Sequence, residues 1–175
     1  MEINKAAGIF NYPDFRIEGK TNWADLGCGT GTFTLALASL LAPESRIYAI
    51  DSNESALKAI PDSYGNADIE KLKADFLTDR FAFENLDGIL MANALHYVKD
   101  KKSFIQKALK HLTENGCFLL VEYDTDIPNN WVPYPQTFSS LQKLFAGSGF
   151  SSIHKLGELP SVYNRAMMYA AIIER

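Results

Sequence analysis

The feature that most constrains this chain is a glycine-rich segment, Asp25-Leu-Gly-Cys-Gly-Thr-Gly31, between a short apolar run and a helical pattern. Residues 23–26 end at the glycines, which is typical of a buried strand that enters a tight turn. Apolar residues then recur with helical spacing from Phe33 to Leu41, and Pro43 ends the pattern. Because glycine permits positive φ, such a loop can lie against a ligand at a helix N-terminus, or it can serve only strand-to-helix packing.

The remaining sequence alternates strand and helix patterns, which is typical of an α/β sheet with parallel strands and helices on both faces. Strand patterns follow the glycine loop at 46–50, 69–74, 87–91 and 117–123, and helix patterns at 52–59, 101–112 and 137–145. The last two strands, at 151–156 and 167–173, lack a helix between them and are expected to form an antiparallel hairpin at one edge. Residues 1–21 show no sustained periodicity, so we expect an irregular lead-in or flap before a single domain at 22–175.

Charge, cysteine content and the length of apolar stretches argue against several classes of protein. The 175 residues carry 17 Lys and Arg against 21 Asp and Glu, a net charge of −4, which argues against a dedicated nucleic-acid binder. The two cysteines, Cys28 and Cys117, fit neither a disulfide framework nor a metal knuckle. The start of the chain lacks a secretory pattern and the apolar stretch 33–42 is too short to span a bilayer, so we expect a cytoplasmic protein with no membrane partner. Its oligomeric state stays open.

Two acidic residues end neighbouring strands of the expected sheet. Asp51 follows the last glycine of the loop by 20 residues, where a carboxylate can accept both hydroxyls of a ribose. Asp75 stands beside Phe76 at the end of the third strand and could accept an adenine amino proton. Taken singly, each acid could be a helix cap or a turn residue. Taken together, they predict a ligand site at the carboxyl edge of the sheet.

The series Asp25-Leu-Gly-Cys-Gly-Thr-Gly31, Asp51, Asp75-Phe76 and Asn93-Ala-Leu-His96 resembles the class I S-adenosylmethionine-dependent methyltransferases, in particular their small-molecule branch. The resemblance covers residues 22–175 and implies a methyltransferase domain there. It also implies a Rossmann-like, seven-stranded, mostly parallel sheet in the order 3-2-1-4-5-7-6, with strand 7 antiparallel and helices on both faces.

The resemblance further implies which residues bind S-adenosylmethionine. Asp25 and Asn93 would hold the amino group of its methionine part, Asp51 the ribose hydroxyls, and Asp75 and Phe76 the adenine. The complete set implied to bind the cofactor is Asp25, Gly27, Cys28, Gly29, Gly31, Asp51, Ser52, Asp75, Phe76, Asn93 and Leu95.

Methyl transfer needs few catalytic groups, because the sulfonium already carries the leaving group and the protein chiefly aligns the reactants. A general base helps only when the acceptor is an unactivated hydroxyl or a protonated amine. His96 is the candidate base, since its ordinary pKa lies near neutrality. The alternative is a loop histidine that packs beneath the cofactor, and Tyr97 has the same ambiguity.

The expected acceptor is a small molecule, because the Asn-Pro-Pro-Tyr pattern for methylating nucleobase amines is absent after the fourth strand. Its site would use the irregular loop 124–135, where Trp131 either binds substrate or covers a core edge. The candidate substrate-binding residues are Tyr12, Tyr97, Tyr123 and Trp131. His111 and His154 suggest no ligand cluster, so no metal site is expected.

Two other function classes fit parts of the pattern. A non-catalytic module that binds S-adenosylmethionine or S-adenosylhomocysteine, as a partner subunit or sensor, would need the same acids as the enzyme. A nicotinamide-linked oxidoreductase is disfavoured for two reasons. The dinucleotide-binding fingerprint has glycine at the position of Thr32, and a terminal antiparallel hairpin is expected here.

Overall fold

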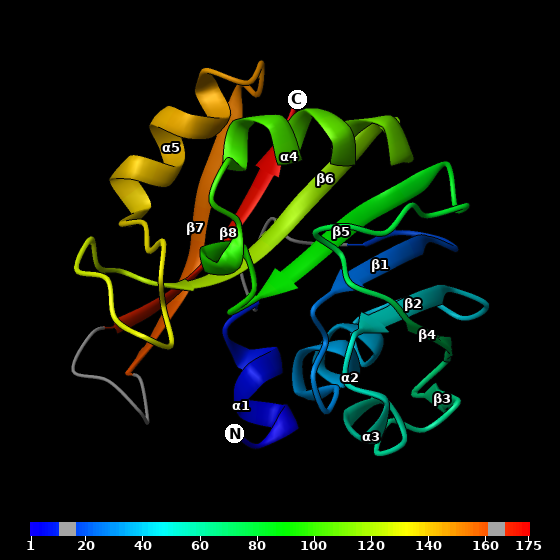
Figure 1. The fold of residues 1–175 in the computed structure, drawn as a ribbon. Helices are drawn as coiled ribbons and strands as arrows, with labels where there is room; N and C mark the ends of the chain where they lie inside the picture. The colour runs from blue at the N-terminus through cyan, green and yellow to red at the C-terminus, as the bar shows by residue number, and fades with distance from the viewer. Residues whose placement is uncertain (11–16, 161–166) are drawn as a thin grey trace.

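The computed structural model describes residues 1–10, 17–160 and 167–175, and within them eight strands form one sheet with helices on both faces (Figure 1). The strands are β1 Asn22–Leu26, β2 Arg46–Asp51, β3 Ser63–Tyr64, β4 Ala67–Lys73, β5 Leu86–Ala92, β6 Leu112–Tyr123, β7 Ser152–Pro160 and β8 Met167–Glu174. The helices are α1 Ile3–Gly8, α2 Thr32–Ala38, α3 Glu54–Leu57, α4 Lys101–Ala108 and α5 Phe138–Ala146, with short 3-10 turns η1 Leu95–Tyr97 and η2 Leu109–His111.

The sheet has the order β3-β4-β2-β1-β5-β6-β8-β7. Its centre is parallel, and β8 runs antiparallel to both β6 and β7, so the expected terminal hairpin is confirmed. The expected count of seven strands and the order stated for them are wrong at the opposite edge, where β3 pairs antiparallel with β4. This two-residue strand is too short to show an alternating pattern in the sequence. The strand forms because the chain turns at Gly65 and pairs back on β4.

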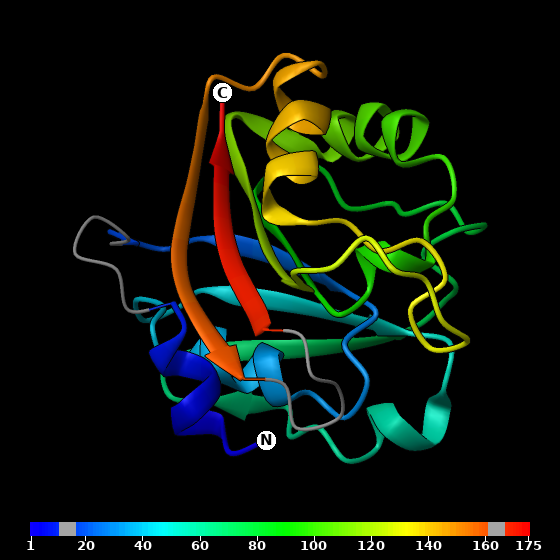
Figure 2. The ribbon, with the colours of Figure 1, turned by 90° about the vertical axis from the view of Figure 1, so that its left-hand side faces the viewer.

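The N-terminal segment contains a helix where the sequence pattern predicts an irregular lead-in. α1 packs on α2, with Phe10 buried and its ring 5.9 Å from that of Phe33. The end of α1 also reaches the far edge of the sheet, because a Cβ at Gly157 in β7 would lie 2.8 Å from the Ile9 carbonyl oxygen (Figure 2). Six helical residues are too few to produce a recognisable period.

The boundary between α4 and β6 also differs from the expectation. The pattern predicts a helix to Leu112 and a turn at Asn115-Gly116, but α4 ends at Ala108 and β6 already begins at Leu112. Pairing of Leu112 with Leu86, followed by an irregularity before the pair Gly88–Cys117, draws this segment into the sheet. Long-range pairing with β5 therefore overrides a local turn signal.

The buried hydrophobic residues form three clusters, and the two larger ones lie under helices on opposite faces of the sheet. α1 and α2 enclose one core against the sheet, while α4 and α5 cover the other face, where Ile105 and Phe145 pack with Phe118 (Figure 1). The connection from β4 to β5, residues 74–85, contains no helix. Phe81 and Phe83 pack against this part of the core instead. No helix in the described part of the chain is long and apolar enough to cross a membrane.

Candidate functional site

The glycine loop joins β1 to α2 in a conformation that glycine permits. Gly27, Gly29 and Gly31 have φ values of 79°, 54° and 84°. A Cβ at Gly27 would lie 2.9 Å from the Ala94 Cβ and 3.1 Å from the Phe76 ring, so no side chain fits there. The amides of Gly27 and Cys28 both donate to the Ile50 carbonyl, at 2.9 and 3.0 Å. The loop is thereby tied to the carboxyl end of β2.

Asp51 ends β2 with its carboxylate held in one orientation. Oδ2 accepts the Gly29 amide and Oδ1 accepts the Asn53 amide, each at 2.8 Å. Asn53 caps α3, since its side chain accepts from the Ser55 and Ala56 amides. Ser52 is exposed beside it. The half-buried Asp51 carboxylate keeps lone pairs on both oxygens, so it is placed to accept hydroxyl protons from a ligand above the loop.

Asp25 and Asn93 bring unpaired acceptors to the ends of neighbouring strands, β1 and β5. Asp25 is 1% exposed, and its Oδ2 accepts the Thr34 hydroxyl at 2.6 Å. Its Oδ1 and the Asn93 Oδ1 are buried without a hydrogen-bond partner in the described structure. Asn93 has the left-handed φ of 54°, which is unusual for a residue other than glycine. Buried acceptors are rarely left unpaired, so these oxygens suit a ligand that donates several protons.

Burial raises the pKa of Asp25 from 3.8 to about 7, the Thr34 hydroxyl opposes the rise, and the nearby Asp51 charge adds to it. A cationic donor beside Oδ1 would reverse this effect by stabilising the ionised carboxylate. The chemistry of the site therefore fits the ammonium and diol groups of S-adenosylmethionine, the cofactor that the resemblance implies.

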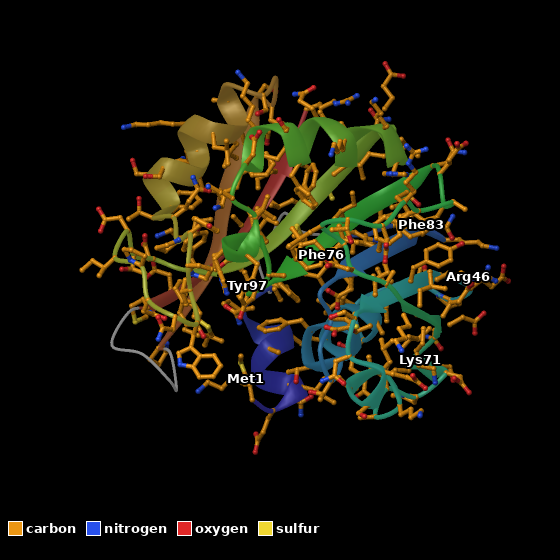
Figure 3. The ribbon with its side chains drawn as sticks, in the orientation of Figure 1. Met1, Arg46, Lys71, Phe76, Phe83 and Tyr97 are labelled. Carbon is orange, nitrogen blue, oxygen red and sulfur yellow. The ribbon has the colours of Figure 1, made fainter. Side chains whose placement is uncertain are left out.

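Asp75 and Phe76 follow β4 at the same edge of the sheet. Asp75 Oδ1 accepts the Leu77 amide at 2.9 Å, which turns the chain sharply away from the strand. The Phe76 ring contacts the glycine loop and lies edge-on to Phe104, with centroids 6.0 Å apart. Figure 3 shows Phe76 and Tyr97 near the carboxyl end of β5. The structure thus brings the expected adenine residues and the expected methyl-side residues to one edge.

Leu95 and His96 are buried in η1, directly after β5. His96 is 3% exposed, and its Nδ1 lies 2.7 Å from Oε2 of Glu122. The other Glu122 oxygen accepts the His96 backbone amide at 3.1 Å. Sequence reasoning missed Glu122, although it is the charged residue in the otherwise uncharged run 117–123. A charge inside an apolar strand is the signal that points to a buried partner.

The loop 124–136 is anchored to η1 by a second buried group. Lys101 Nζ donates to the carbonyls of Val98 and Tyr134, at 2.9 and 2.7 Å, and burial lowers its pKa. The Tyr134 amide donates to the His96 carbonyl at 3.0 Å. These bonds place the irregular loop beside the methyl-side residues, and Lys101 is a second contributor that the sequence pattern does not reveal.

The four candidate substrate-binding residues differ in their surroundings. Tyr97 is 45% exposed and its ring contacts His96, with centroids 4.5 Å apart, while the Tyr123 ring lies 6.1 Å from His96. Trp131 is 80% exposed, so the alternative that it covers a core edge is wrong. Tyr12 lies outside the described residues. Tyr97 and Tyr123 are therefore the two that the structure brings together.

Comparisons with known proteins identify the family of this chain. A family model described as a methyltransferase domain matches residues 24–118. An uncharacterised methyltransferase of Mycobacterium tuberculosis is 26% identical over 101 residues, which are 58% of this chain and 50% of that protein. The ubiquinone/menaquinone biosynthesis C-methyltransferase of Pasteurella multocida is 24% identical over 156 residues, or 86% of this chain and 53% of that protein. The chain thus spans about half the length of these curated relatives.

A solved structure extends the similarity to nearly the whole fold. The 1,6-didemethyltoxoflavin-N1-methyltransferase of Burkholderia thailandensis superposes with a TM-score of 0.72 at 16% identity, covering 99% of this chain and 77% of that one. Its fold is shared even though few residues are. Because the matched family model covers more than half of the sequence and includes the glycine loop, Asp51, Asp75 and Asn93, the chain belongs to the methyltransferase domain family.

Proposed function

We propose that this chain binds S-adenosylmethionine at the carboxyl edge of β1, β2, β4 and β5 and transfers its methyl group to a small-molecule acceptor. The observation that carries the proposal is the unpaired, buried Oδ1 of Asp25. A carboxylate buried in this way destabilises the free protein unless a cationic group binds beside it. An α-ammonium group supplies both the charge and the donors.

The binding residues act on different parts of the cofactor. Asp25 and the Asn93 segment hold the ammonium group at the ends of β1 and β5. Asp51, already oriented by the Gly29 and Asn53 amides, accepts the ribose hydroxyls. Gly27 and its neighbours Cys28, Gly29 and Gly31 let the backbone approach the methionine part closely. Ser52, Asp75 and Phe76 border the adenine, and Leu95 forms the floor on the methyl side.

The bound cofactor supplies an electrophilic methyl group on a good leaving group. The chain's own residues then have to position the acceptor in line with it and exclude water. We propose Tyr97 on η1 and Tyr123 at the end of β6 for this role, and Tyr12 and Trp131 as further substrate-binding residues. The similar structure from Burkholderia thailandensis has 1,6-didemethyltoxoflavin bound, which supports a small-molecule acceptor here.

We assign His96 to the support of η1 rather than to proton transfer. Its side chain is almost completely enclosed, and Glu122 engages both its Nδ1 and its backbone amide. This arrangement fixes η1, and with it Leu95 and Tyr97, against β6. It favours the packing role that the sequence leaves as the alternative to a general base.

Thermal-shift measurements test the binding half of the proposal. S-adenosylhomocysteine should raise the melting temperature and NAD should not, because a ligand stabilises only the state that binds it. Equal shifts, or none with S-adenosylhomocysteine, would contradict the site.

Transfer itself is tested with S-adenosylmethionine labelled in the methyl group and an extract of small metabolites. Label in an extract component, absent with the Asp51→Ala variant, supports the enzyme. Tight binding without transfer to any component favours the non-catalytic binding module instead.

A further inference from the structure

A cavity of about 820 Å³ lies between the helix-free connection 74–85 and α4, away from the proposed ammonium and ribose contacts. Its lining includes Leu26, Phe76, Val98, Phe83 and His111. Gly27, Asp51 and Asp75 are not among its lining residues. Figure 3 shows Phe76 and Phe83 at separate points along the connection. Of the proposed cofactor-binding residues, Phe76 alone lines the cavity.

The topology explains why this space is open. A parallel crossover normally carries a helix that covers the sheet, as α2 and α4 do for their connections. Residues 74–85 form no helix, so the sheet beside α4 is covered only by an irregular segment rich in phenylalanine. A segment without a helix leaves a hollow against α4 that its side chains do not fill.

The walls of the cavity are apolar and held in place by ring contacts. Phe81 and Phe83 are stacked with centroids 4.9 Å apart, and the Phe83 ring lies 5.5 Å from the His111 ring. His111 Nδ1 is also 2.9 Å from the Phe83 carbonyl oxygen, which ties the connection to η2. Phe76 also meets Phe104 edge-on. The surface is thus suited to a flat or aliphatic body.

The charged groups around the cavity are mostly basic. Arg80, Lys99, Lys107 and Lys110 line it, and none of them forms an ion pair within the described part of the structure. The lining also holds two acids. Asp79 accepts the Asp75 amide, and Asp100 caps α4 by accepting from Ser103, which together with the Lys107 charge lowers the pKa of Asp100. With four basic and two acidic side chains in its lining, the hollow has a local charge opposite in sign to the net charge of the chain.

From the aromatic walls and the excess of basic groups in the lining we infer that this cavity binds a small organic anion with an apolar body, such as an aryl or alkyl carboxylate, sulfonate or phosphate. The apolar part lies between the phenylalanine rings, and the anionic group lies toward Lys107 and Lys110 at the α4 side. The volume is within the range of small-molecule sites. The cavity shares Phe76 with the proposed adenine contacts, but the inferred binding needs none of the groups that hold the ammonium or the ribose.

Titration with anilinonaphthalene sulfonate, whose fluorescence rises in apolar surroundings, tests the inference. One site per chain is expected, with the uncharged analogue phenylnaphthylamine binding more weakly. The double variant Lys107→Ala, Lys110→Ala should weaken binding of the sulfonate by about tenfold, corresponding to about 1.4 kcal/mol. Lys102→Ala, on the same helix as Lys107 but outside the cavity lining, is the matched control and should bind like the wild type.

Several results would overturn the inference. The sulfonate could fail to bind, or bind at many weak sites. The uncharged analogue could bind with equal affinity, or the double variant and the control could lose affinity equally. Stoichiometric displacement of the sulfonate by S-adenosylhomocysteine would also overturn it, because the cavity would then be part of the cofactor cleft. A thermal shift with S-adenosylhomocysteine, measured on the same samples, reports separately on the proposed function.

Discussion

Cofactor binding should weaken as the pH falls through neutrality, because Asp25 must be ionised to hold an ammonium group. Burial raises the pKa of Asp25 to about 7 in the free protein. If only the ionised form binds, the apparent dissociation constant for S-adenosylhomocysteine rises about tenfold between about pH 8 and about pH 6. Isothermal titration at several pH values measures this slope, and proton release below neutrality should accompany binding.

The same group should make the free protein less stable at high pH. The folded-state pKa of Asp25 is raised, so its stabilising contribution is complete below the unfolded value of 3.8 and is lost as the pH rises through about 7. The rise in pKa corresponds to about 4 kcal/mol in the free energy of unfolding. Asp25→Asn, which cannot ionise, should therefore gain stability relative to the wild type as the pH increases, while losing affinity for the cofactor.

Denaturant unfolding at about pH 5 and about pH 8 measures this gain, which should be about 2 to 3 kcal/mol. Asp68→Asn, at an exposed acid of β4, is the matched control and should show no such change. The reasoning is refuted if Asp25→Asn and the wild type have parallel pH dependences, or if the variant binds S-adenosylhomocysteine as tightly as the wild type.

Three further substitutions probe the rest of the site. Asp51→Ala should weaken S-adenosylhomocysteine binding by about 10- to 100-fold, because two charge-assisted hydrogen bonds to the ribose are lost; unchanged affinity in a calorimetric titration would remove the ribose assignment. Gly27→Ala should lower the free energy of unfolding by about 1 to 3 kcal/mol, since its Cβ would meet Ala94 at positive φ; a variant with wild-type stability and binding would count against the need for close approach. Glu122→Gln should lower stability by a similar amount while leaving the shape of the pH–rate profile unchanged; a shift of that profile would instead assign proton transfer to His96.

The parts of the site that the sequence predicts are those with local signals. Asp25, the glycine loop and Asp51 each stand at the end of an apolar run, and parallel strands bring such ends to one edge. The hydrogen bond from Gly29 to Asp51 is a direct consequence of that arrangement.

The parts that the sequence does not predict depend on distant pairing. Glu122 and His96 are separated by 26 residues in the sequence, and Lys101 donates to the carbonyl of Tyr134, which is 33 residues away. The strand β6 begins at Leu112 because β5 lies beside it, and not because of its own residues. α1 and β3 are too short to show a period. In each case the conformation depends on tertiary contacts, and the local sequence pattern carries no information about those contacts.

A crystal structure of the complex with S-adenosylhomocysteine tests the central claim most directly. The account predicts the ribose hydroxyls on the Asp51 carboxylate, the amino group beside Asp25 Oδ1, and the adenine bordered by Asp75 and Phe76. A ligand bound elsewhere, or bound with these carboxylates turned away from it, would contradict the account.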